Sequence, residues 1–162
     1  MDGETSRRGA VRSGGESEHG GAGAAAGHDW LLERWVRLAE LGVEVGVTLQ
    51  LGGLLISGTL VGARHYLEYQ RSDVLADLVQ RGLPPLIARK VDRAFATDLE
   101  AMAESDQAER DGAASPRRFI HLKDACIIAD GGHRASFVVP YWRGQLRRVD
   151  AFFLGSIRQA SD

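Results

Sequence analysis

The sequence predicts an α+β domain built on a small antiparallel β-sheet. Three observations carry the prediction: an alternating apolar pattern over residues 43–51, a glycine pair directly after it, and two helical segments followed by more strand-like segments. Sequential antiparallel strands interrupted by helices are typical of the α+β class. We therefore expect a small barrel or a curved sheet, with an N-terminal helix and a helical pair inserted at about 63–111.

The composition limits the classes of protein to which this chain can belong. The chain has 162 residues, of which 44% are hydrophobic and 26% charged. These are ordinary globular values, so a collagen-like or fully disordered chain is excluded. The net charge of −2 is far from the strongly basic balance typical of general nucleic-acid binders. The single cysteine, Cys126, rules out an internal disulfide and favours a reducing, cytoplasmic setting.

The first 28 residues differ from the rest. They contain eight of the 20 glycines, and no aromatic residue, leucine or isoleucine precedes Trp30. Such a segment buries too little apolar surface to offset backbone ordering, so we predict a disordered Gly-rich tail over 1–28 and one domain over 29–162. We see neither the apolar core of a signal peptide nor a stretch long enough to span a membrane, and expect no membrane partner.

The first half of the domain starts with a helix and a hairpin. Asp29 is the expected N-cap of the helix, and Gly42 is its C-terminal glycine. The alternation over 43–51 predicts a strand with one buried face. Gly52 and Gly53 then predict a hairpin turn, and residues 54–61 the returning strand, with a bend at Gly58.

Two helices are expected next. Good helix formers over 63–81 predict the first, with Ser72-Asp73 as an internal break. Pro84-Pro85 start the second, and apolar residues at helical spacing continue it to about Arg110.

The C-terminal half is rich in strands. We expect them at 119–128, 137–139, 141–146 and 149–157, with a turn at 130–132. In the last strand we place Phe152 in the core and Phe153 on the outside, unless a bulge near Asp150 exchanges the two roles. Asp150 lies among apolar residues and needs a partner, for which we consider Arg143, Arg147 and Arg148.

No familiar catalytic motif occurs, and we expect no catalytic residue, no cofactor and no enzyme activity. The best cluster of chemically active residues comprises His121, Asp124, Cys126, Asp130 and His133. Histidine, cysteine and carboxylate are zinc ligands, but this spacing matches no zinc pattern, so we expect no metal. Cys126 is expected to be buried, with polar neighbours exposed.

The distribution of charge and aromatic residues suggests interaction surfaces. Tyr141, Trp142 and Arg143, followed by Arg147, form a pattern that can stack on nucleic-acid bases, although Trp142 also fits a core position. Residues 72–112 carry a net charge of −4 and residues 113–162 one of +4. Either both are simply solvated, or one protomer's acidic helix docks on another's basic sheet, which predicts a homo-oligomer.

Several blocks together resemble gas vesicle accessory proteins of the U type (the GvpU family). The resemblance covers about residues 30–158 and is carried by the hairpin 45–61, the Tyr-Leu-Glu-Tyr block 66–69, the Phe-Ile-His-Leu-Lys block 119–123, the Trp-Arg-Gly block 142–144 and the Val-Asp-Ala-Phe-Phe-Leu-Gly block 149–155. It implies a non-enzymatic accessory of gas vesicles, the protein-shelled gas compartments that give cells buoyancy. The implied partners are gas vesicle shell proteins, and the implied location is the cytoplasm, in association with vesicles.

A second resemblance concerns the fold. The N-terminal helix, the hairpin strands and the last strand look like an Sm-like or SH3-like small barrel. Two hypotheses follow: a protein that clusters or helps to assemble gas vesicles through self-association, and, as the alternative, an Sm-like RNA-binding module, for which the weak overall charge makes nucleic acid an unlikely partner. The candidate interaction residues for both are Tyr141, Trp142, Arg143, Arg147, Asp150, Phe152 and Phe153.

Overall fold

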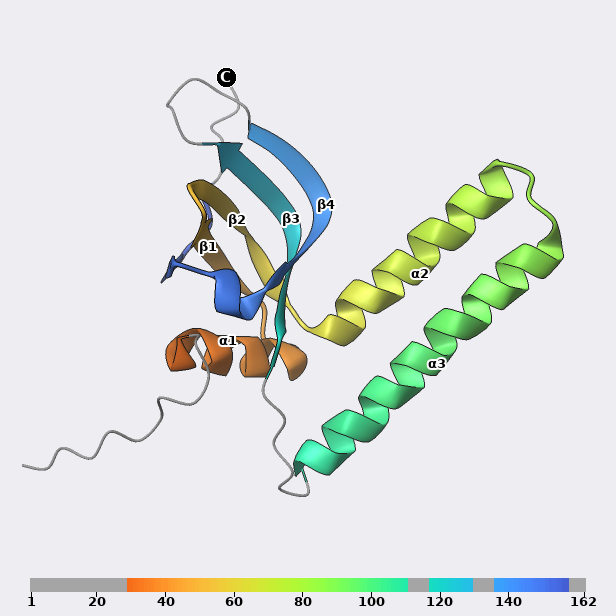
Figure 1. Ribbon diagram of the computed structural model, residues 1–162, viewed down its shortest axis with the longest axis horizontal. Coiled ribbons are helices and arrows are strands. Elements are labelled where there is room, and N and C mark those ends of the chain that lie inside the picture. The colour runs from red at the N-terminus through yellow and green to blue at the C-terminus, as the bar shows by residue number, and fades with distance from the viewer. Residues whose placement is uncertain (1–28, 111–116, 130–135, 158–162) are drawn as a thin grey trace, which may run out of the picture.

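The computed structural model describes residues 29–110, 117–129 and 136–157 (Figure 1). The elements follow the chain in the order α1 (Trp30–Glu40), β1 (Val45–Leu51), β2 (Leu54–Val61), α2 (Ala63–Gln80), α3 (Pro85–Arg110), β3 (Phe119–Ala129), β4 (Ser136–Gln145), a short 3₁₀ helix η1 (Leu146–Arg148) and β5 (Ala151–Leu154). The predicted tail over 1–28 and the predicted turn at 130–132 lie outside the described residues.

The five strands form one antiparallel sheet in the order β4-β3-β2-β1-β5. The sheet is strongly curved, as Figure 1 shows, but β4 and β5 remain its two edges, so it is not closed. The α+β prediction is confirmed in the form of a curved sheet. The specific likeness to an Sm-like or SH3-like barrel is not confirmed.

The N-terminal helix α1 covers one end of the sheet. The Asp29 carboxylate accepts hydrogen bonds from the backbone N–H groups of Leu31 and Leu32, as expected of an N-cap. The helix buries Leu32, Val36 and Ala39 against a core that the sheet supplies from β1, β2 and β3. The hydrophobic effect of this burial fixes the helix to the sheet.

The β1–β2 turn and the irregularity within β2 were both predicted from glycines in the sequence. Gly52 and Gly53 both have positive φ angles, of 53° and 85°, which the tight β1–β2 turn requires. At Gly58 the pairing between β2 and β3 shifts register, opposite Asp124, whose φ is 50°. A Cβ at Gly58 would lie 2.9 Å from the Lys123 carbonyl oxygen, so only glycine lets the bulged strand approach this closely.

The C-terminal strands differ from the prediction. Residues 136–145 form the single strand β4, where we expected separate strands at 137–139 and 141–146. Pro140 does not interrupt β4 because an edge strand has one side without a sheet partner, where a missing N–H is not needed. The predicted strand 149–157 is shorter, since η1 occupies 146–148 and β5 ends at Leu154.

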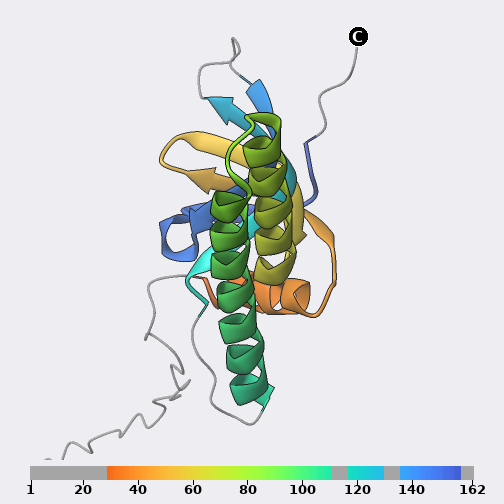
Figure 2. The same ribbon diagram turned by 90° about the vertical axis from the view of Figure 1, so that its right-hand side faces the viewer.

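The inserted helices form a hairpin that projects from the sheet (Figures 1 and 2). The predicted break at Ser72-Asp73 is wrong: α2 is one continuous helix of 18 residues. Both residues are exposed, so polar side chains with lower helix propensity are accommodated there at a small energetic cost. An Arg71–Asp92 ion pair of 2.6 Å joins α2 to α3 along the hairpin.

Candidate functional site

The edge strand β5 presents large apolar side chains to solvent. Phe153 is 51% exposed and Leu154 46% exposed, and Ile157 follows them at 38%. Adjacent residues of a strand point to opposite faces, so exposure of both Phe153 and Leu154 means that neither face is fully covered at this edge. We call Phe153, Leu154 and Ile157 the β5 edge. Such an apolar edge is the usual kind of surface for a protein partner.

A chain of hydrogen bonds holds the segment after β5 across the sheet. The Thr48 hydroxyl donates to the Gly155 carbonyl oxygen at 2.8 Å, and the Ile157 N–H donates to the Ser57 hydroxyl oxygen at 2.7 Å. The two hydroxyls are 2.9 Å apart. Since the Thr48 proton is used on Gly155, Ser57 is the donor between them. The chain thus runs in one direction, from the Ile157 amide to the Gly155 carbonyl.

This arrangement explains why Thr48, on the outer face of β1, is buried. The sequence pattern predicts that Thr48 faces solvent, yet both Thr48 and Ser57 are almost completely buried. Gly46 makes room for the covering segment, because a Cβ there would lie 3.1 Å from the backbone nitrogen of Ser156. In the sequence, the only sign of this hydrogen-bonded arrangement is that residues 48 and 57 carry hydroxyl groups. Such residues are too common to be singled out.

Asp150 stabilises the turn next to this edge. Its carboxylate accepts a hydrogen bond of 2.7 Å from the Gly52 N–H, and its own N–H donates to the Gln50 carbonyl. None of the arginine partners that we considered is paired with Asp150 among the described residues, because Asp150 is exposed at a strand end where the Gly52 amide is within reach. Asp150 therefore fixes the start of β5 against the β1–β2 turn.

The two phenylalanines of β5 lie as predicted. Phe152 pairs with Leu49 and packs against the hydrophobic core, whereas Phe153 pairs with Thr48 and points outward. Phe152 thus belongs to the fold, and Phe153 is available for contact.

Tyr141, on the opposite edge of the sheet, is occupied by the helical hairpin. Its hydroxyl lies 2.6 Å from His65 Nε2, and its ring stacks on Tyr69 with centroids 4.0 Å apart. Burial is the main cause of a raised Tyr141 pKa. Beside it, an ion pair of 2.5 Å joins Lys123 to Glu44 and, through this hydrogen bond, raises the Lys123 pKa. The Tyr141 contacts attach the first turns of α2 to β4, and the ion pair joins β3 to the segment before β1.

Trp142 and Arg143 also have partners within the fold. Trp142 packs against the core, and a Cβ at Gly144 would overlap its ring. The Arg143 guanidinium lies 3.7 Å above the Phe119 ring, a cation–π contact. Arg147, on η1, is exposed and donates to the Gln145 side chain. The predicted base-stacking cluster is therefore divided between the two faces of β4, with its aromatic rings already stacked or packed internally.

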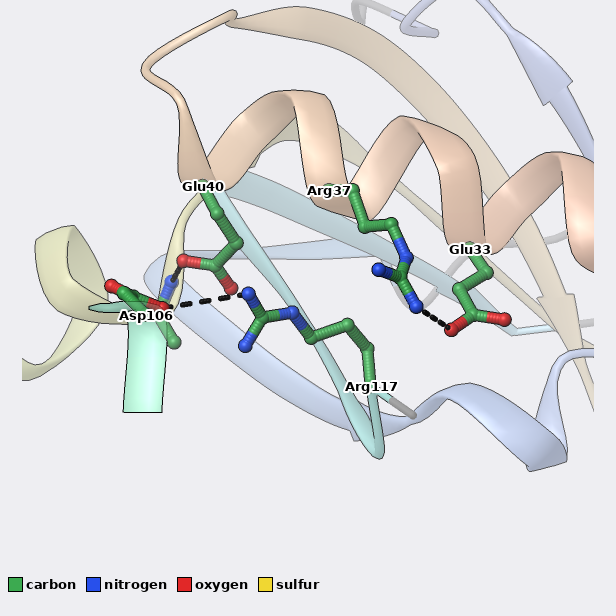
Figure 3. A network of polar contacts seen from close by, with 6 residues as sticks. Glu33, Arg37, Glu40, Asp106 and Arg117 are labelled. Atoms are coloured by element: carbon green, nitrogen blue, oxygen red, sulfur yellow. Dashed lines mark hydrogen bonds and ion pairs between the residues drawn. The ribbon is translucent and has the colours of Figure 1, made fainter. Parts of the chain in front are cut away.

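A cavity of about 270 Å³ lies where the base of the hairpin meets the sheet, and Tyr66, Met102, Arg117 and His121 are among its lining residues. His121 is buried with its ring 4.7 Å from that of Tyr66, and burial together with the Arg143 charge lowers the His121 pKa to about 4. Figure 3 shows Glu40 and Arg117 pointing toward one another beside Asp106. The Arg117–Asp106 ion pair is 3.5 Å long.

No metal centre is found in the part of the chain that the structure describes, where no three His, Cys, Asp or Glu residues come together. Asp130 and His133 of the predicted cluster lie outside that part. Cys126 is buried, as expected, and Asp124 is exposed at the bulge. No helix over the described residues is long and apolar enough to cross a membrane.

Comparison with known proteins adds one finding. The family model for gas vesicle protein GvpU-like matches residues 29–157, which is most of the chain and includes every candidate interaction residue. No curated protein and no solved structure matches. The match begins at Asp29, the N-cap of α1, and ends at Ile157, whose N–H donates to the Ser57 hydroxyl. The chain therefore belongs to the GvpU-like family of gas vesicle proteins.

Proposed function

We propose that this protein is a non-enzymatic gas vesicle accessory that binds the vesicle shell through the β5 edge and promotes vesicle assembly or clustering through self-association. The observation that carries the proposal is the exposed Phe153–Leu154 pair on a strand that hydrogen bonds hold in place. A large aromatic side chain on a rigid support is a typical anchor for a protein partner, because little conformational entropy is lost on binding.

Family membership supports the choice of partner. Members of this family are gas vesicle proteins, so a shell protein is the partner we assign to the apolar edge. If one copy binds one shell and the copies associate with each other, neighbouring vesicles become bridged. Multivalency then converts weak single contacts into useful avidity, with gains of about 10²–10⁴ over either single affinity.

The test is co-sedimentation with purified gas vesicles. We expect Phe153→Ala to melt near the parent temperature and to stay in the supernatant, because an exposed ring contributes little to the fold. Phe152→Ala should lower the free energy of unfolding by about 3–5 kcal/mol, since it removes a side chain packed on the core.

The matched control is Phe137→Ala on the opposite edge strand β4. Phe137 is 55% exposed, nearly the same as Phe153, so its replacement removes an equal apolar area at a different place. It should pellet like the parent protein. If Phe153→Ala pellets as well as Phe137→Ala, the shell contact lies elsewhere.

A further inference from the structure

The side of α3 turned away from α2 carries an ordered stripe of residues. Buried or half-buried apolar residues (Val91, Phe95, Leu99 and Met102) occupy the inner side of the helix. A second stripe, about 100° wide and centred about 155° around the helix from the first, is what we call the outer face of α3: Leu86, Arg89, Arg93, Ala96, Thr97, Glu100 and Glu104. Apart from the half-buried Ala96, all are exposed, and most of them line a groove of about 740 Å³.

The charges on the outer face are segregated by sign. Arg89 and Arg93 lie in the N-terminal half of α3, and Glu100 and Glu104 in the C-terminal half. The neighbours at i,i+4 spacing are therefore like charges, which destabilise a helix.

None of these four side chains has an ion-pair partner among the described residues. Lys90 and Asp92 also line the groove, but the Asp92 carboxylate is held by Arg71 of α2. The two like-charge pairs of the outer face are thus left without an ion-pair partner in the described fold. A partner whose charges run in the opposite direction along the groove would compensate it. The α3 helix of a second copy meets this condition when it runs antiparallel to the first.

We propose that the outer face of α3 is a homodimer interface, on which two copies of the chain pair their α3 helices antiparallel about a two-fold axis between Ala96 and Thr97. In this register Arg93 faces Glu100 of the partner subunit, and Arg89 faces Glu104 of the partner subunit. The interface is isologous, so each ion pair forms twice.

The residues at the proposed axis suit a close crossing of two helices. Ala96 is small, and the Thr97 hydroxyl donates to the Arg93 carbonyl oxygen at 3.1 Å, so its polar group is already satisfied. Small side chains at the crossing point allow two helices to approach to about 8–10 Å between axes. The hairpin projects from the sheet, so two copies can meet there without contact between their sheets (Figure 2).

The role of this dimer rests on the proposed function. The dimer supplies the self-association by which two shell-bound copies bridge vesicles. It leaves the β5 edge free on both subunits. The dimer can be measured without vesicles, so its failure and the failure of shell binding are separate results. The contacts are mostly ionic, so salt should weaken the dimer as the screening length falls from about 10 Å at 0.1 M to about 3 Å at 1 M.

The test is sedimentation velocity of the full chain with charge-reversal variants. Arg93→Glu and Glu100→Arg should each raise the dimer dissociation constant at low salt about tenfold or more, because each places like charges opposite one another twice. The double variant Arg93→Glu/Glu100→Arg should restore dimerisation, because the swapped charges again face opposite charges. Asp98→Arg is the matched control, since Asp98 is an exposed acid of α3 outside the outer face.

Two other results would overturn the proposal. One is a parent chain that stays monomeric at low salt and high concentration. The other is a double variant as weak as the single ones. If Arg93→Glu strengthened association instead, the acidic helix would be docking on a basic sheet, which also contradicts α3 pairing.

A second variant tests the geometry directly. Thr97→Cys lies beside the proposed axis, and oxidation should link two copies through it, because the two Cα atoms meet across the crossing. Asp98→Cys, one residue along, should not crosslink. The native Cys126 is buried and does not interfere.

Discussion

The hydroxyl groups of Thr48 and Ser57 hold in place the edge strand to which we assign shell binding. Both are buried, and their hydrogen bonds reach backbone groups more than 90 residues later in the chain. Buried hydrogen bonds of this kind matter most when one partner is removed, because the group left behind stays desolvated.

Thr48→Val should therefore lower the free energy of unfolding by about 1–3 kcal/mol, since the Gly155 carbonyl loses its donor while the side-chain volume is nearly unchanged. Urea denaturation measures the change. Thr59→Val is the matched control: Thr59 is a half-buried threonine of β2 without a side-chain hydrogen bond among the described residues, and its replacement should change stability by less than about 0.5 kcal/mol. Equal effects of the two variants would mean that the hydroxyl chain does not hold the segment.

His121 should make stability depend on pH. Its pKa is about 4 in the folded state against 6.5 in the unfolded chain, so the unfolded state binds the proton first as the pH falls. Stability should therefore decrease between about pH 6.5 and about pH 4, by about 3 kcal/mol in total, and this contribution should level off below pH 4. Urea titrations of the parent and of His121→Phe measure it, and identical pH slopes for the two proteins would contradict the account.

At the scale of elements, the positions of α1, β1, β2 and α3 could be predicted because periodicity and caps are local signals. Asp29 caps its helix through its own side chain, and Gly52-Gly53 determine the turn through their own φ angles. The elements that were mispredicted depend on tertiary contacts, which local sequence patterns do not encode. Pro140 is tolerated because β4 lies at an edge, which local sequence does not reveal.

The candidate site was predictable only in part, for the same reason. The inward and outward sides of Phe152 and Phe153 follow from alternation along a strand. The partner of Asp150 depends on which backbone amide lies nearby in space, and no pattern in the sequence encodes the Gly52 amide. Tyr141 and Arg143 looked available to a nucleic acid because their partners, Tyr69 and Phe119, are distant in the sequence.

Tyr141→Ala should loosen the helical hairpin from the sheet. The change removes the ring that contacts His65, Tyr66 and Tyr69 of α2 and the hydroxyl that bonds His65. We expect faster hydrogen exchange in the first turns of α2 and nearly unchanged exchange in β1 and β5. Phe137→Ala, also on β4 but away from α2, serves as the control. If α2 exchanges at the parent rate, the hairpin is held by other contacts, such as Arg117–Asp106.

At the scale of the whole molecule, the described fold presents two separate surfaces, one apolar and one charged, on different structural elements. The β5 edge lies on the sheet, and the outer face of α3 lies on the projecting hairpin (Figure 1). A protein with one surface for a shell and another for its own copy has the valency that bridging requires. This division of roles is the central claim of our account.

The N-terminal 28 residues are not required for either surface in this scheme. A chain that starts at Gly27 retains the Asp29 cap and should unfold cooperatively at nearly the parent temperature. Thermal unfolding followed by circular dichroism measures this. Loss of the cooperative transition would show that the segment contributes to the fold.

The most direct test of the central claim is photo-crosslinking on intact gas vesicles, with a photoreactive phenylalanine analogue placed at position 153. The same analogue at position 137, equally exposed on the opposite edge, is the control. Our account predicts that the analogue at 153 forms covalent adducts with a shell protein, identified by mass spectrometry, and that the analogue at 137 does not. Shell adducts from 137 and none from 153 would contradict it.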